Sequence, residues 1–266
     1  MSARQARQRP GNARAPADGM KLHRRSLRLD GRPYTVVTPR PGTTARFSTN
    51  FFHETWHVLS DDRGARLFGR LLWGLAYQAR PGTVVAIGPA FLDPTPFDAD
   101  PADPIVLLPA WHTGLTPRAI KDLRTGLRRG GSDGTVRWRT PGLDAALADV
   151  RGWYRRTVPA HHHRDSGDVT RAGGAIVLRP GSALEARTWA VSAADLDSAR
   201  YGTDHAYLGE HGRWPTGEVQ IFRNYREKIG TARRARAEVL RRPGTPAGPD
   251  ALRRAVWDQV AVIRAR

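Results

Sequence analysis

The sequence contains two continuous apolar runs, TVVAIG at residues 83–88 and IVLL at residues 105–108. Runs of this kind are typical of strands buried on both faces of a sheet, because a half-exposed strand alternates polar and apolar side chains. We therefore expect both runs at the centre of a sheet. PYTVVT at residues 33–38 and GEVQIFR at residues 217–223 predict two further strands.

Amphipathic helices are predicted on both sides of these runs in the chain. The clearest start is Thr116-Pro117, where the threonine caps the helix and the proline occupies its first position. Apolar side chains three and four residues apart predict helices over residues 64–78, 117–129, 141–158, 224–242 and 250–263. Residues 175–179 and 183–191, on either side of Pro180-Gly181-Ser182, are expected to form a hairpin, and residues 201–217 a long polar loop.

These elements predict an α/β or α+β fold with a single mixed β-sheet and helices packed on it. Residues 1–20 contain almost no large apolar side chain, which predicts a disordered basic tail. We expect an α/β core domain over residues 21–242, and a Pro/Gly linker with a C-terminal amphipathic helix over residues 243–266.

The charge of the chain is strongly positive. The formal net charge is +18, and 40 of the 43 basic residues are arginine. Such a balance attracts polyanions, nucleic acid above all, although a GC-rich coding bias also favours arginine over lysine. There is no cysteine, which excludes disulfides and thiolate metal sites. The absence of an apolar signal segment and of a membrane span predicts a cytoplasmic protein.

Basic residues crowd two of the predicted helices, where few acidic residues oppose them. Arginine forks suit phosphate oxygens, so these helices are candidates for contact with a nucleic-acid backbone. The candidate polyanion-binding residues are Lys121, Arg124, Arg128, Arg223, Arg226, Arg233, Arg234, Arg236, Arg241 and Arg242. No zinc-finger or RNP pattern accompanies them, and no phosphate-binding glycine loop or nucleophile elbow is present.

The sharpest local motif is FFHETWHVL at residues 51–59. On a helix, His53 and His57 would share a face and could bind one Zn²⁺, and Glu54 could act as the catalytic general base. Over about nine residues the sequence resembles the His-Glu-x-x-His motif of zinc metallopeptidases. The next helix offers neither histidine nor carboxylate as a third ligand, which leaves open Asp61, Asp62, His112 or a residue of the polar stretch with Asp204, His205, Glu210 and His211. The alternative is that the apolar neighbours of these histidines pack in the core.

Four aspartates, Asp93, Asp98, Asp100 and Asp103, lie in a proline-rich loop between the two most apolar strands. They could hold a divalent cation, or form local turns and balance nearby arginines.

Three hypotheses for function follow. The first is an accessory protein that binds a polyanion through its tail and arginine-rich helices. The second is a zinc-dependent hydrolase or peptidase, and zinc is the one cofactor that the sequence suggests. The third is a protein-interaction module whose charge maintains solubility. The sequence leaves open whether the chain is an enzyme.

Overall fold

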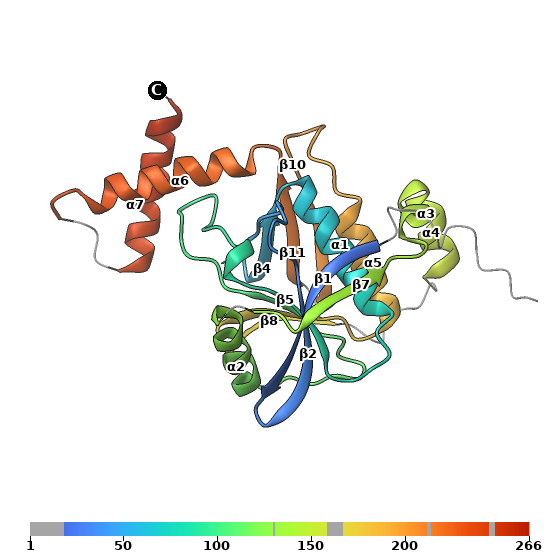
Figure 1. The fold of residues 1–266 in the computed structure, drawn as a ribbon. Helices are drawn as coiled ribbons and strands as arrows, with labels where there is room; N and C mark the ends of the chain where they lie inside the picture. Colours follow the sequence, from blue (N-terminus) through green and yellow to red (C-terminus); the bar gives the residue numbers. More distant parts are fainter. Residues whose placement is uncertain (1–18, 130, 159–166, 212–213, 245–247, 266) are drawn as a thin grey trace, which may run out of the picture.

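The computed structural model describes residues 19–129, 131–158, 167–211, 214–244 and 248–265. The chain has a mixed α/β fold, as predicted, but the strands form two mixed sheets rather than one (Figure 1). The single-sheet prediction was wrong because strand runs far apart in the sequence pair with each other in the second sheet, which no local pattern shows.

The larger sheet has seven strands in the order β7-β1-β2-β5-β6-β9-β8. Both parallel pairs, β2 with β5 and β6 with β9, include a strand that contains one of the two apolar runs. The strands are β1 (Gly19–Leu29), β2 (Arg32–Thr38), β5 (Thr83–Ile87), β6 (Ile105–Leu107), β7 (Gly134–Arg139), β8 (Asp168–Ala172) and β9 (Ala175–Arg179).

The smaller sheet has four strands in the order β10-β11-β4-β3. They are β3 (Ser48–Phe52), β4 (Thr55–Ser60), β10 (Thr203–His211) and β11 (Trp214–Phe222). Two antiparallel hairpins, β3–β4 and β10–β11, meet where β4 and β11 run parallel. Segments more than 140 residues apart in the sequence therefore lie side by side.

The helices are α1 (Asp62–Ala76), α2 (Pro117–Arg128), α3 (Leu143–Ala148), α4 (Val150–Thr157), α5 (Ala183–Ala194), α6 (Tyr225–Leu240) and α7 (Pro249–Arg264), with a short 3-10 turn η3 (Pro89–Phe91). Helices α1 and α5 pack on each other and share one apolar core with the inner faces of both sheets. Gly69 makes this contact possible, because a Cβ there would lie 2.6 Å from the Ala190 carbonyl oxygen.

The two apolar runs are central in the larger sheet, as predicted. Val85 and Ile87 of β5 face the core that contains α1 and α5. Val84 and Ala86 face a second core beneath α2. Burial on both faces explains why this strand shows no polar alternation. The predicted start of α2 is also confirmed, because the Thr116 hydroxyl accepts a hydrogen bond from the Ala119 amide.

Three local predictions were wrong. Residues 183–191 form helix α5 instead of a strand, because Ser182 caps a helix whose first turn contains Glu185. The helix expected over residues 141–158 is divided into α3 and α4 at Asp149, which caps the second part. The loop expected over residues 201–217 is largely strand β10 and its hairpin with β11.

The predicted tail lies outside the described residues except for Gly19 and Met20, which begin β1, and so do linker residues 245–247. In the parts of the chain that the structure describes, no helix has the length and apolar character needed to cross a bilayer.

Helices α6 and α7 form a pair that projects from the sheets (Figure 1). The loop at residues 93–103 holds this pair in place. Ala99, with a positive φ of 55°, packs into the seam between the two helices. Asp98 and Asp100 beside it accept bonds from Arg253 of α7, and Asp100 also accepts one from Arg236 of α6 at 2.6 Å.

We expect Asp98→Asn to lower the free energy of unfolding by about 2 kcal/mol, because the Asp98 carboxylate is buried and hydrogen-bonded. Asp250→Asn is a matched control, because Asp250 pairs with the same Arg253 but has a side chain 79% exposed, against 8% for Asp98. That change should cost less than about 0.5 kcal/mol. Urea unfolding followed by circular dichroism measures both. Equal effects would contradict the role given to the loop.

Candidate functional site

The His-Glu-x-x-His motif does not lie on a helix, so the helical geometry expected for it was wrong. His53 and Glu54 form the two-residue turn between β3 and β4, with φ values of 47° and 62°. Two successive positive φ angles are the signature of a type I′ hairpin turn. The turn separates the two histidines, because His57 lies within β4.

The residues of the motif do not fit a zinc site. The His53 ring stacks on Phe52 with ring centroids 3.8 Å apart. Both nitrogens of His57 already contact other side chains. Among the described residues, no group of three or more histidine, aspartate or glutamate side chains is arranged to hold a metal ion. We therefore assign no metal-dependent role to Glu54.

His57 instead belongs to a row of polar side chains that crosses the smaller sheet. Strand pairing places Tyr207 of β10 opposite Glu218 of β11, Glu218 beside His57 of β4, and His57 opposite Asn50 of β3. Side chains that face each other across strands point to the same side of the sheet. The side chains of these four residues therefore lie in one row on the same face of the smaller sheet.

One hydrogen bond and one ion-pair contact connect the residues at the centre of this row. The His57 Nδ1 atom lies 2.9 Å from Asn50 Oδ1, and His57 Nε2 lies 3.4 Å from Glu218 Oε2. Asn50 Oδ1 and Glu218 Oε2 are both acceptors, so His57 donates to both of them when each ring nitrogen carries a proton, and to one of them when the ring carries a single proton. Glu218 contacts His57 through Oε2 alone, and the structure gives no bond between its Oε1 atom and His57.

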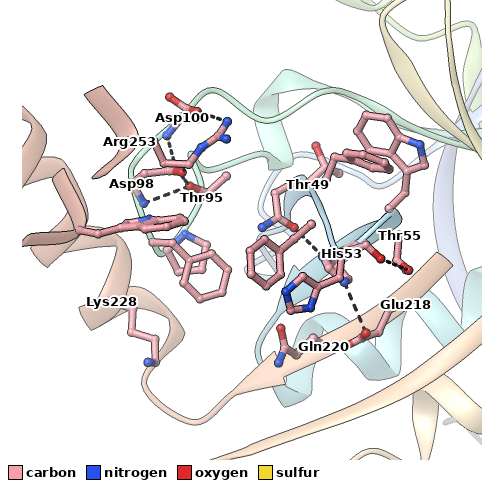
Figure 2. A pocket seen from close by; sticks show the side chains of 18 of the residues that line it. Thr49, His53, Thr55, Thr95, Asp98, Asp100, Glu218, Gln220, Lys228 and Arg253 are labelled. Carbon is pink, nitrogen blue, oxygen red and sulfur yellow. Dashed lines mark hydrogen bonds and ion pairs between the residues drawn. The ribbon is translucent and has the colours of Figure 1, made fainter. Parts of the chain in front are cut away.

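The row forms part of the floor of a groove of about 930 Å³ between the smaller sheet, the 93–103 loop and helices α6 and α7 (Figure 2). Four aromatic side chains of the lining, Phe51, Phe52, Tyr207 and Trp257, are between 41% and 54% exposed. Large apolar rings are seldom left this open on adjoining elements without a ligand or partner. The groove is therefore the strongest candidate site.

Carboxylates around the groove are mostly neutralised by arginines of the same chain. Asp93 pairs with Arg233, Asp98 with Arg253 and Asp103 with Arg171. Since Asp100 is paired as well, each of the four loop aspartates balances an arginine, as one of the two alternatives predicted.

Two cations of the groove are not neutralised in this way. Lys228 of α6 and Arg264 of α7 both line it, and no carboxylate of the described residues lies within ion-pair distance of either. Burial lowers the pKa of the Lys228 ammonium, the Arg264 guanidinium lowers it further, and Glu227 opposes the shift. Like charges held together without a counter-charge favour the binding of an anion.

The structure divides the predicted polyanion-binding residues between two places. Lys121, Arg124 and Arg128 lie on α2, on a different side of the molecule from α6 (Figure 1). On α6, Arg233 and Arg236 are committed to ion pairs with the aspartate loop. Arg223, Arg226 and Arg124 donate to backbone carbonyls, and Arg242 to Gln259. Arg234, Arg241, Lys121 and Arg128 are exposed.

Comparison with protein-family models, curated proteins and solved structures finds no match to this chain. Support for a function therefore comes from the groove itself.

Sequence reasoning did not identify Asn50, Glu218, Tyr207, Trp257 or Arg264 as site residues. The strand GEVQIFR was predicted, and its polar residues Glu218 and Gln220 alternate with buried Val219 and Ile221. That alternation marks a face away from the core. No local signal shows that β3, β4 and β10 supply the neighbours.

Replacing His53-Glu54 by Asn-Gly should raise the free energy of unfolding by about 1 kcal/mol, because Asn-Gly adopts the type I′ turn with less strain. Thermal or urea unfolding of the double variant measures this, with Glu54→Gly alone as the control for half of the effect. Destabilisation by the double change would contradict the turn assignment.

Proposed function

We propose that this chain binds single-stranded nucleic acid in the groove between the smaller sheet and helices α6 and α7, as a cytoplasmic accessory protein. The observation that carries the proposal is the presence, in one groove, of open aromatic rings and of two cations that form no ion pair with a carboxylate of the described residues. Proteins that bind single strands use this combination, with aromatic faces for the bases and positive charge for the backbone.

The aromatic rings favour a single strand over a duplex. Base faces are available for stacking only where bases are unpaired, and a stacked base contributes about 1–3 kcal/mol. Phe52 lies at the end of β3, Tyr207 lies on β10, and Trp257 faces the groove from α7. Rings from both walls could therefore receive bases of a strand that follows the groove. A groove of this volume has room for a ligand of nucleotide size.

Lys228 and Arg264 supply the contact to phosphate. A bound phosphate would supply a counter-charge at ion-pair distance, which no carboxylate of the described residues provides, and it would oppose the effect of Arg264 on the Lys228 pKa. The whole chain has a formal net charge of +18. The positive charge outside the groove would attract the strand over longer distances without defining where it binds.

Lys228→Ala with Arg264→Ala should weaken binding of a fluorescein-labelled U8 oligonucleotide about tenfold or more, and reduce the slope of log K against log salt by about 1.4. Lys121→Ala with Arg128→Ala on α2 removes the same charge from the other side of the molecule. The second pair should change the affinity by less than about twofold. Fluorescence anisotropy at several salt concentrations measures both.

Equal losses for the two pairs would show that binding depends on net charge alone and would contradict a site in the groove. No measurable binding by the wild-type chain at low salt would overturn the proposed function.

A further inference from the structure

We infer that the polar floor of the groove recognises guanine, through the carboxylate of Glu218. The inference rests on the proposed function, because it assigns base preference to the same groove. The Glu218 carboxylate lies on the floor of the groove, where contacts with other side chains hold it in place.

Side chains of neighbouring strands hold Glu218 in place. Its Oε2 atom faces His57 Nε2, and His57 is held in turn by Asn50. The Glu218 side chain is only 12% exposed and lines the groove. A carboxylate in this position can accept two hydrogen bonds side by side, but has no hydrogen to donate while it is ionised.

Guanine is the standard base that presents two adjacent donors on its pairing edge, the N1–H and the N2 amino group. Adenine and cytosine place an acceptor next to their amino donor, and uracil has one N–H between two carbonyl oxygens. An ionised carboxylate therefore matches guanine with two bonds and the other bases with at most one. A ligand that left this partly buried carboxylate without donors would lose the hydrogen bonds that water supplies.

Two residues near Glu218 offer further contacts to a guanine base. Gln220 lies two residues further on the same face of β11 and lines the groove, so its amide can donate to the guanine O6. Tyr207, opposite Glu218 on β10, is 54% exposed and offers a ring face beside the carboxylate. Figure 2 shows Glu218 and Gln220 on the sheet side of the groove and Lys228 on the helix side. A guanine bound at Glu218 would therefore allow Lys228 to contact the phosphate backbone.

The test uses the full chain and three labelled octanucleotides that consist of uridine except for one central guanosine, inosine or adenosine. Inosine keeps N1–H but lacks the N2 amino group. The guanosine strand should bind the wild-type chain roughly ten- to hundredfold more tightly than the other two, the range for a bidentate base contact. Glu218→Gln should remove that preference while keeping affinity for the adenosine strand.

Glu227→Gln is the charge-matched control, because Glu227 is exposed on α6 and does not line the groove. It should leave the guanosine preference unchanged. Equal wild-type affinities for all three strands would overturn guanine recognition and leave strand binding intact. Failure of all three strands to bind the wild-type chain would overturn both proposals. The comparison of strands on the wild-type chain does not depend on the folding of any variant.

Discussion

The groove exists because Asp98 and Asp100 bind the arginines of α6 and α7. Asp98 is almost fully buried and accepts a bond from Arg253 Nε at 3.2 Å, and Arg236 reaches Asp100. A second connection comes from Tyr225, whose hydroxyl lies 2.6 Å from Ser48 Oγ on β3, while Ser48 donates to the Pro94 carbonyl. These bonds hold the helix pair above the smaller sheet, and without them the two walls of the groove would not face each other.

This arrangement separates the two uses of charge in the chain. The arginines that contact the aspartate loop stabilise the fold, because the aspartates neutralise their charge. Lys228 and Arg264 remain available at the groove, next to aromatic rings and opposite the polar row of the sheet. The same high arginine content therefore holds the helix pair in place and, under the proposed function, leaves Arg264 with Lys228 to bind a ligand, which a count of basic residues does not reveal.

The parts of the fold that the sequence predicts are those with strong local signals. The apolar runs of β5 and β6 and the Thr116-Pro117 start of α2 need no distant partner to be recognised. Asp30-Gly31 after β1 and Ser182 with Glu185 at α5 are local signals of the same kind, for a tight hairpin turn and a helix start. The helix predicted for His53 and His57 was wrong because a spacing of four residues fits both a helix and a tight hairpin. His-Glu is also an unusual sequence for a type I′ turn. The groove combines β3, β4, β10, β11, α6 and α7, so only long-range pairing could reveal it.

The most direct test is to locate a bound strand on the protein by ultraviolet cross-linking, followed by mass spectrometry of the tryptic peptides. The account predicts adducts on peptides that contain Phe51 and Phe52, Tyr207 or Trp257, which are lost when unlabelled oligonucleotide competes. Adducts confined to α2, or spread over the basic surface with none in the groove, would contradict it.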